Sequence, residues 1–377
     1  MTIRVVPVET RQQQKQFFQL PWQLYADDPC WVPPLRKNQL ELLGYKSHPF
    51  HQDATMQTFV ALRDGKPCGR IAAIIHHAHN VRYKENRGYF GFYESIDDED
   101  VSGRLFDAVF DWFIARDIDC VRGPMNPSFN YEIGLLIDGF EYPPTFMMTY
   151  NPPYYESLIE SYGGFYKSQD FYAYWGDAEM LRTKDKKLDF IGQEAMKRFN
   201  VKVRRMDRSR FTQDIRVFLD IYNRSFQTHW GFVPLSEPEL EHMASELKHL
   251  LVPELTVIAE VDGKPIGCVF GILDYNPRIK KIDGRLFPFG FIRLLWNRKA
   301  IKKVRIIAVN VLPEYQRWGV GMVLINQIEP IALAWKIQEG EFSWVMESNM
   351  LSMKTLERGG AIRQKTYRIY DRNLEGV

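Results

Sequence analysis

The stretch VNVLPEYQRWGVGMVLI, which begins at Val309, has residue types and spacing suited to binding an anionic ligand. A β-branched run stops there at a proline-containing turn. Gly319 and Gly321 then begin an apolar helix, which is predicted to run to about Lys336 with a kink at Pro330. Backbone N–H groups and the positive dipole end at such a helix start attract anions, and glycine lets a ligand approach the backbone closely. The stretch therefore favours binding of a pyrophosphate.

With its Gln-x-x-Gly-x-Gly order after a strand, this stretch closely resembles the acetyl-coenzyme A loop of the GNAT acyltransferase superfamily. The segment FSWVMES, followed by Asn349 and a helix that ends in Gly-Gly, is similar to the family's next motif. The resemblance implies an α/β (α+β) fold, with a mixed central sheet flanked by helices. It also implies acetyl-CoA or a longer acyl-CoA as co-substrate, and no metal. The coenzyme contacts that it implies fall on Asn310, Val311, Gln316, Arg317, Trp318, Gly319, Val320, Gly321, Met322 and Asn349.

Two hairpin signals indicate that the chain contains an internal duplication. FVALRDGKPCGRIAAII begins at Phe59 and VIAEVDGKPIGCVFGIL begins at Val257, and their matching residues lie 198 positions apart. Asn151 and Asn349, each followed by a helical segment that ends in Gly-Gly, have the same separation of 198. Asp-Gly between two apolar runs predicts a tight β-hairpin. The elements around the hairpins repeat as well, so we predict a tandem GNAT arrangement.

The two copies differ where the coenzyme loop is expected. The first half reads ESIDDEDVSGRL there, with consecutive acids from Asp97 to Asp100 and no Gly-x-Gly. Carboxylates at this position would repel a phosphate. We therefore predict a degenerate domain over residues 1–180, a connector over residues 181–200, and a catalytic domain with the acyl-CoA loop over residues 201–377.

Acyl transfer to an amine requires a group that removes the amine proton and, ideally, a donor for the leaving thiolate. The resemblance implies a Glu base and a Tyr acid at two motif positions, but Arg305 and Leu356 occupy them. Glu347, at the end of the predicted strand FSWVMES, is the leading candidate for the general base, and an ion pair with a basic residue is the structural alternative. Tyr367 and His229 are further candidates, as proton donor and as substrate contact. Aromatic residues in a final strand such as that of Tyr367 are more often core residues, and packing of its loop on the core explains His229 equally well.

Composition excludes several classes of protein. Lys plus Arg (49) nearly equals Asp plus Glu (47), which argues against a dedicated nucleic-acid-binding protein. The four cysteines show no metal-like or disulfide-like spacing, so a reduced cytoplasmic compartment is expected. No run approaches the ~20 apolar residues that span a bilayer. His76, His77 and His79 lack acidic or Cys partners at ligand spacing, so no metal site is predicted.

The segment 278–305 contains ten Lys or Arg and one acid, Asp283, around the aromatic run LFPFGFIRLLW. An apolar segment flanked by cations suits an anionic membrane surface or the entrance for a lipid-like substrate. A buried hairpin with a charged rim, or contact with the phosphates of coenzyme A or RNA, is the alternative. Together with the degenerate first half, the segment resembles tandem GNAT proteins of bacteria that include proposed ceramide synthases, which join a fatty acyl group to a sphingoid amine.

We therefore predict an acyl-CoA-dependent N-acyltransferase that acts on a small-molecule or lipid-like amine, for example a sphingoid base. The protein is expected in the cytoplasm, peripheral to the inner face of the membrane, and its oligomeric state is left open. Two rival functions remain. One is a non-catalytic acyl-CoA sensor, which the missing Glu and Tyr would favour, and the other is a Fem-like aminoacyl or peptidyl transferase.

Overall fold

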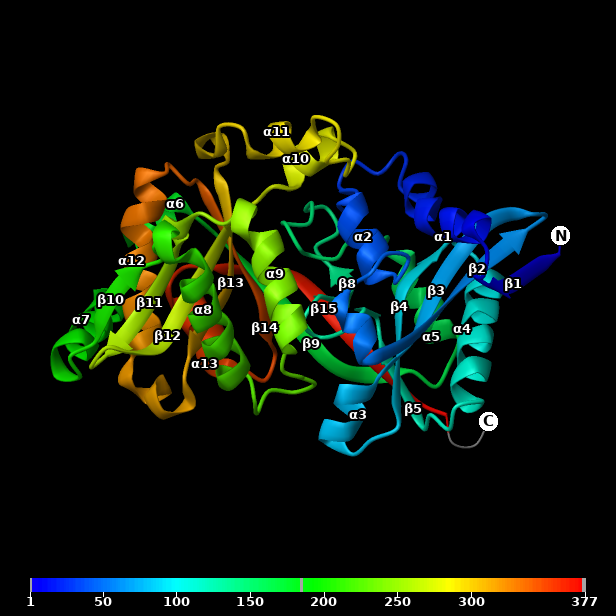
Figure 1. Cartoon of the computed structure of the whole chain (residues 1–377), viewed down its shortest axis with the longest axis horizontal. Helices are drawn as coiled ribbons and strands as arrows, with labels where there is room; N and C mark the ends of the chain where they lie inside the picture. Colours follow the sequence, from blue (N-terminus) through cyan, green and yellow to red (C-terminus); the bar gives the residue numbers. More distant parts are fainter. Residues whose placement is uncertain (1, 184–185, 375–377) are drawn as a thin grey trace. The chain divides into compact units, whose positions relative to one another are not determined.

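The computed structural model describes residues 2–183 and 186–374 (Figure 1). The chain forms two compact units, of which the first comprises residues 1–170, 276–291 and 365–377 and the second comprises residues 171–275 and 292–364. The boundaries predicted from the sequence place segments 276–291 and 365–377 in the second domain, whereas both segments belong to the first compact unit.

The first unit is built on a mixed sheet with the strand order β1-β2-β3-β4-β5-β15. Strands β1 to β4 are antiparallel, β5 is parallel to β4, and β15 is antiparallel to both β5 and β8. Its main elements are β1 (Ile3–Pro7), α1 (Arg11–Leu24), α2 (Arg36–Leu42), β2 (Ala54–Arg63), β3 (Lys66–His76), α3 (His77–Tyr83), β4 (Arg87–Ser95), α4 (Glu99–Ile114), β5 (Cys120–Gly123), β6 (Met125–Asn126), β7 (Glu132–Ile133), β8 (Leu135–Asp138), α5 (Tyr154–Ser161), α10 (Asn276–Lys281) and most of β15 (Ile362–Asn373).

The second unit repeats this plan with the strand order β9-β14-β13-β12-β11-β10. Strands β10 to β13 are antiparallel, β14 is parallel to β13, and β9 is antiparallel to β14. Its main elements are most of β9 (Tyr166–Asp177), α6 (Ala178–Thr183), α7 (Lys186–Arg198), β10 (Lys202–Arg205), α8 (Phe211–Ser225), α9 (Glu237–Leu250), β11 (Thr256–Val261), β12 (Lys264–Leu273), α11 (Gly290–Leu295), β13 (Lys303–Val311), the 3-10 turn η5 (Pro313–Trp318), α12 (Val320–Ala334), β14 (Glu339–Met346) and α13 (Met350–Arg358).

The hairpin prediction is confirmed in both units. Asp64 and Gly65 connect β2 to β3 with φ angles of 49° and 81°, and Asp262 and Gly263 connect β11 to β12 with φ angles of 50° and 73°. Two consecutive residues with positive φ form the turn that matches the right-handed twist of paired strands. The repeated Asp-Gly is therefore a requirement of the fold.

One helix packs on the corresponding face of each sheet, and its sequence explains why. In α4 the residues Val101, Leu105, Val109 and Phe113 recur every four positions, and all are fully buried. This helix packs against β2 and β3, and α12 packs against β11, β12 and β13 in the second unit (Figure 1). Both helices start at the end of the strand that precedes them, which is where the coenzyme loop was predicted in the second half.

The last strand of each sheet comes from the other half of the sequence. Strand β9 pairs with β14 in the second unit, and the C-terminal strand β15 pairs with β5 in the first. Both strands follow the helix after the repeated Asn, so they occupy equivalent places in the duplication. Neither half of the sequence therefore completes its own sheet.

Candidate functional site

Strands β13 and β14 separate where the predicted coenzyme site begins. Their parallel pairing runs from Lys303–Glu339 to Ile306–Phe342, although β13 continues to Val311. Beyond the last pair, the edge of β13 that faces β14 pairs with no strand among the described residues. Val309, in this part of β13, is 38% exposed, which is unusual for a valine in a central strand. The separation leaves backbone available to an extended ligand.

The loop after β13 brings the start of α12 to the same end of the sheet. Gly319 ends η5 with a φ of 78° and caps α12, whose first turn contains no acid. A Cβ on Gly321 would meet only Val309 Cγ1, at 3.9 Å, so the space in front of this glycine is open. The first N–H groups of a helix have no partner within the helix. This helix start can therefore accept an anion.

Four of the other predicted coenzyme residues have clear structural surroundings. Gln316 Nε2 donates to the Val311 carbonyl over 3.3 Å and so ties the loop to the strand end. The Trp318 ring stacks on Phe199 at 4.3 Å between centroids. Asn310 is 3% exposed, and its Nδ2 has no hydrogen-bond partner among the described residues. A buried donor without a partner costs ~1–3 kcal/mol unless a ligand or water satisfies it.

The connector helix α7 supports the loop from one side. A Cβ on Gly319 would lie 3.0 Å from Ile191 Cγ2, and a Cβ on Gly192 would lie 3.3 Å from the Met322 backbone. Two glycines thus allow α7 and the start of α12 to approach closely. Arg317 and Met322, which the resemblance assigned to the coenzyme, lie in the loop and in the first turn of this supported helix.

Arg305, which stands where the resemblance implied a Glu base, forms a buried structural network. Its Nε donates to Ser343 Oγ over 3.0 Å, and Ser343 Oγ donates to Glu341 Oε1 over 2.7 Å. All three residues are at most 3% exposed. The network connects β13 to β14 at the level of their last pairs, so it holds the strands together just before they separate. Sequence reasoning missed this role, since only the pairing register places Arg305 opposite Glu341.

Glu347 and Asn349 lie in the turn between β14 and α13. Strand β14 ends at Met346, so Glu347 follows the strand end as predicted, and its side chain is partly exposed. The Asn349 side chain accepts a hydrogen bond from the Ser352 N–H over 3.1 Å and caps α13. A capping role accounts for Asn349 without a ligand. Its contact with the coenzyme stays a prediction.

The two remaining catalytic candidates belong to different units. His229 lies after α8 in the second unit, where its ring packs against Phe226 at 4.6 Å and burial lowers its pKa. Tyr367 lies on β15 in the first unit, opposite Leu136 of β8, and is completely buried. A completely buried hydroxyl is a poorer candidate for a proton donor than a partly exposed group. Their catalytic roles stay predictions.

In the first unit, protein groups occupy the equivalent places. Asp98 caps α4 and accepts from the N–H groups of Asp100 and Val101 over 3.0 and 3.1 Å. At the end of β4, the Tyr155 hydroxyl accepts from the Ser95 N–H over 3.0 Å and donates to Glu94 Oε2 over 2.7 Å, and the Tyr154 hydroxyl donates to the Ser95 carbonyl over 2.9 Å. These contacts fill both the anion position and the strand end.

The separation of β4 and β5 is filled as well. Asn126 Oδ1 accepts from the Phe92 N–H over 2.5 Å, and a Cβ on Gly91 would lie only 1.8 Å from the Met125 carbonyl oxygen. Asn126 is thus bonded within the interior of the first unit. Tyr154 and Tyr155, which bond to Ser95, follow Asn151 in the first half, whereas the second half has Ser352 and Met353 at the equivalent positions. This difference was the sequence signal for the filled end of β4.

The histidines of the run IIHHAHN, which are His76, His77 and His79, contact different side chains. Burial lowers the pKa of His76 and of His79 to about 4. His77 Nε2 lies 2.9 Å from Thr55 Oγ1, and His79 Nε2 lies 3.4 Å from Glu85 Oε2. These contacts account for the histidines without a bound ion.

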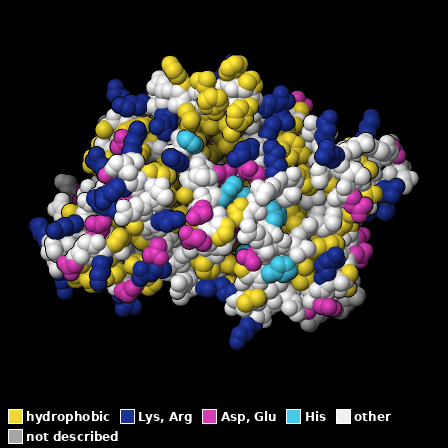
Figure 2. Space-filling view, viewed as in Figure 1, with side chains coloured by type: hydrophobic (Ala, Val, Ile, Leu, Met, Phe, Trp, Pro, Cys, Tyr) yellow, Lys and Arg dark blue, Asp and Glu magenta, His cyan; other side chains and the backbone are white. Residues whose placement is uncertain are grey.

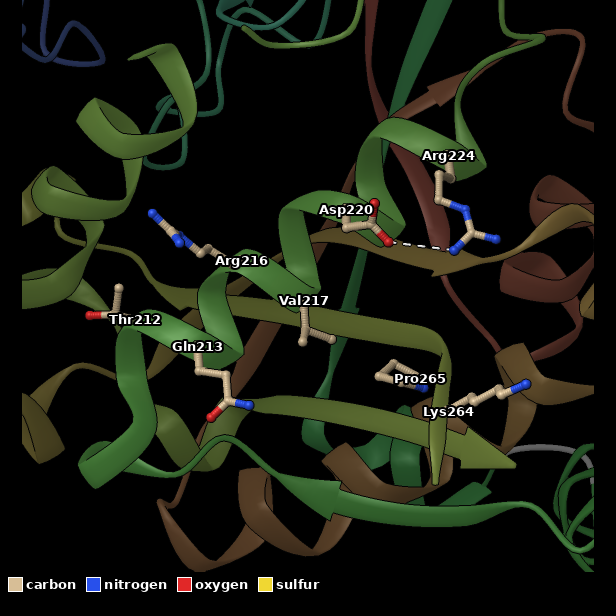
Figure 3. A pocket seen from close by; sticks show the side chains of 8 residues that line it. All are labelled: Thr212, Gln213, Arg216, Val217, Asp220, Arg224, Lys264 and Pro265. Atoms are coloured by element: carbon tan, nitrogen blue, oxygen red, sulfur yellow. Dashed lines mark hydrogen bonds and ion pairs between the residues drawn. The ribbon is translucent and has the colours of Figure 1, made fainter. Parts of the chain in front are cut away.

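A surface pocket of about 760 Å³ lies elsewhere in the second unit, between α8 and the start of β12 (Figure 3). Arg216, Asp220 and Arg224 line it from the helix, and Lys264 lines it from the repeated hairpin. Arg224 pairs with Asp220 at 3.5 Å and with Glu314 of η5 at 3.6 Å. None of the predicted coenzyme residues lines this pocket, so it is distinct from the candidate site.

Comparisons with known proteins agree with this geometry. The model of the acetyltransferase (GNAT) family matches residues 215–360, which contain β13, the glycine loop, α12 and β14. Protein YghO of Escherichia coli (strain K12) is 35% identical over 372 residues, which cover 96% of this chain and 93% of that protein. The chain belongs to the GNAT superfamily. A bacterial ceramide synthase of Caulobacter vibrioides is 34% identical over 383 residues, which cover 99% of this chain and 98% of that protein.

Solved GNAT structures confirm the tandem fold. A tandem GNAT protein from the clavulanic acid biosynthesis pathway has a TM-score of 0.58 at 10% identity and covers 100% of both chains. The glucosamine N-acetyltransferase region of a fungal β-N-acetylglucosaminidase has a TM-score of 0.57 at 14% identity, over 98% of this chain and 38% of that protein. Likeness at such low identity shows the fold alone. The GNAT fold, two tandem domains and membership of an acyltransferase family are thus confirmed.

Proposed function

We propose that the chain is an N-acyltransferase that moves an acyl group from a coenzyme A thioester to the amine of a large or lipid-like acceptor. The observation that carries this proposal is the difference between the two units at one place in the fold. The second unit has an exposed strand residue at Val309 and a helix start without an acid, whereas the first unit places its own side chains at the strand end and at the helix start. This difference supports coenzyme binding in the second unit.

The residues of the second unit suit such a ligand. The N–H groups at the start of α12 would hold the pyrophosphate, with Gly321 allowing close approach. The exposed edge of β13 around Val309 would pair with the extended arm, and the buried Asn310 amide offers a further donor. When bound, the thioester supplies the activated acyl group.

Glu347 is the residue that we propose as general base. It follows the end of β14, the strand that separates from β13, and would remove the proton from the attacking amine. His229 is the alternative base, because burial lowers its pKa and favours the neutral ring that accepts a proton. Tyr367, which belongs to the first unit and is completely buried, stays a sequence-based prediction.

Our proposal for the acceptor amine uses the name of one relative and the exposed aromatic residues between Phe287 and Trp296. The Caulobacter relative, which this chain matches over 99% of its length, is named a bacterial ceramide synthase. We therefore propose a sphingoid base or a similar long-chain amine as acceptor, and a long-chain acyl-CoA as donor. The described residues contain no helix that is both long and apolar enough to cross a membrane.

The test is consumption of acyl-CoA thioesters by the full chain, followed as release of the free thiol. We expect turnover with long-chain acyl-CoA and a sphingoid base, and slower turnover with acetyl-CoA or a short amine. Binding of acyl-CoA without thiol release, for every amine in the panel, would instead favour the sensor. Transfer from aminoacyl-tRNA would favour the Fem-like alternative.

A further inference from the structure

Five large apolar side chains are exposed within a segment of eleven residues, 286–296, which we call the aromatic tip. Figure 2 shows hydrophobic side chains gathered at the upper edge of the view, where Figure 1 draws α11, with Lys and Arg side chains nearby. The exposed fractions are 78% for Phe287, 68% for Phe289, 43% for Phe291, 46% for Ile292 and 73% for Trp296. A contiguous apolar patch of this kind usually marks an interaction surface.

The segment that leads into the tip is held firmly within the first unit. Asp283 accepts from Trp22 Nε1 over 2.6 Å and from Arg36 Nη2 over 2.5 Å, and its carbonyl accepts from Arg36 Nε over 2.9 Å. A Cβ on Gly284 would lie 2.1 Å from the Pro34 carbonyl oxygen, so the two backbones are in close contact. The aromatic tip is thus presented by an anchored segment.

The charge around the tip is positive. Asp283 is the one acid of segment 278–305, and its carboxylate already serves Trp22 and Arg36. Arg293 and Lys299 are exposed beside the aromatic residues, and Arg285 is exposed but pairs with Asp283 at 3.5 Å.

Other cations of the same segment have structural roles. Arg298 Nη1 donates to the carbonyls of His249 and Leu251 over 3.2 and 3.0 Å, at the end of α9. Arg305 is buried in the network with Ser343. Arg298 and Arg305 thus hold the fold, whereas Arg293 and Lys299 are exposed at the surface.

We propose that the aromatic tip inserts into the interface of an anionic bilayer. Phe and Trp side chains partition into this interface, and nearby Arg and Lys are attracted to anionic headgroups. A protein partner is less suited, because stable protein interfaces use about 20–30 residues a side and the tip offers eleven. The proposal of membrane insertion depends only on the aromatic tip and the cations beside it. Its consequence, that the acceptor amine is taken from the bilayer, rests on the proposed function.

The test is co-sedimentation of the full chain with vesicles of phosphatidylcholine alone and of phosphatidylcholine mixed with phosphatidylglycerol. We expect binding to the anionic vesicles, and a loss of about tenfold or more in Phe287→Ser/Phe289→Ser, since both rings would leave the interface. Arg293→Gln/Lys299→Gln should weaken anionic binding by about fivefold for each cation and reduce its salt dependence. Phe190→Ser on α7 removes another ring that is 61% exposed, and should change nothing.

Two further measurements keep this result separate from the acyltransferase proposal. Both tip variants should retain coenzyme A affinity and thiol release with a short, water-soluble amine, because no predicted catalytic residue is altered. Vesicle binding without any thiol release would support the tip and refute the enzyme. Equal sedimentation of the wild type and Phe287→Ser/Phe289→Ser would overturn the proposal. So would a wild-type dimer that this variant dissociates, because the surface would then belong to a second copy.

Discussion

The end of β4 in the first unit and the end of β13 in the second occupy the same place in a duplicated fold, yet side chains of α5 fill the first while the second is partly exposed. Ser95 and Val311 are equivalent, because each pairs with the glycine of the repeated hairpin. Two tyrosine hydroxyls bond the N–H and the carbonyl of Ser95, whereas the Val311 carbonyl accepts from Gln316 of its own loop and Val309, two residues earlier, is 38% exposed. Asp98 caps α4, while Gly319 begins α12 without a side-chain cap. The comparison indicates that, where a ligand site is lost, protein groups take over the hydrogen bonds that the ligand would have made.

The filled place in the first unit depends on a buried carboxylate. Glu94 Oε2 accepts from the hydroxyls of Tyr25 and Tyr155, each over 2.7 Å, and Oε1 lies 3.3 Å from Arg70 Nη2. Burial raises the pKa of Glu94, while Arg70 and the two tyrosines oppose that shift. Asn310 is the residue of β13 that corresponds to Glu94. Each lies one position before the strand residue that pairs with the glycine of the repeated hairpin. The second unit thus has an amide Nδ2 without a hydrogen-bond partner among the described residues, where the first unit has a hydrogen-bonded carboxylate.

The largest effect is expected from Glu347→Gln, which keeps the shape but removes the basicity. General base catalysis contributes ~10²–10⁴-fold, so kcat should fall by that factor while coenzyme A affinity stays nearly constant. The matched control is Thr149→Val, since Thr149 lies 198 positions earlier and its hydroxyl donates to the Gly134 carbonyl over 3.1 Å. This control should leave kcat unchanged. If Glu347→Gln keeps more than about a third of kcat while His229→Gln loses ~10²-fold, His229 is the base.

Gly321→Val should weaken coenzyme A binding by about a hundredfold, because two charge-assisted hydrogen bonds of ~1.5 kcal/mol each would be lost. The added side chain has open space in the free protein, so the fold should survive. The control is Gly103→Val in α4, where a Cβ would meet only Tyr162 Cδ2 at 3.8 Å. Calorimetry should show unchanged affinity for the control. Unchanged affinity in Gly321→Val would refute the loop assignment.

Local signals made much of this fold predictable. The Asp-Gly turns, the strand before the glycine loop and the helix after it each depend on residues close in the sequence. The exchange of β9 and β15 was not predictable, because each strand fits either sheet equally well by pattern. The bonds of Tyr155 to Ser95 and of Asp283 to Trp22 were also missed, since they join positions far apart in the sequence. The glycine loop of the candidate site was predicted, because its residues are contiguous in the sequence. The Arg305 network was missed, because it depends on how β13 pairs with β14.

Tyr155→Phe should lower the free energy of unfolding by ~1–3 kcal/mol, because the Ser95 N–H and a Glu94 oxygen lose a buried partner. The Tyr155 hydrogen bond favours the charged form of Glu94, so its removal raises the folded-state pKa of Glu94 further. The stability difference from wild type should therefore shrink as the pH falls and Glu94 becomes protonated in the folded protein. Urea unfolding at several pH values measures this. A change in coenzyme A affinity would contradict the view that this position belongs to the first unit alone.

The smallest effect is expected from Asp98→Gly, which removes the carboxylate cap of α4 and its ion pair with Arg63. Glycine is itself an acceptable N-cap, so the loss of stability should be a few tenths of a kcal/mol. Coenzyme A affinity should not change. New coenzyme A binding in this variant would mean that Asp98 alone closes the first unit, which the tyrosine contacts at Ser95 argue against.

The most direct test of the central claim is the number of coenzyme A sites per chain, measured by titration calorimetry on the full protein. One site is expected, because the second unit combines the solvent-exposed part of β13 around Val309 with a helix start that contains no acid. That site should be weakened in Gly321→Val and retained in Asp98→Gly and Tyr155→Phe. Two sites per chain, or a single site that is lost in Tyr155→Phe and kept in Gly321→Val, would contradict the division of roles between the units.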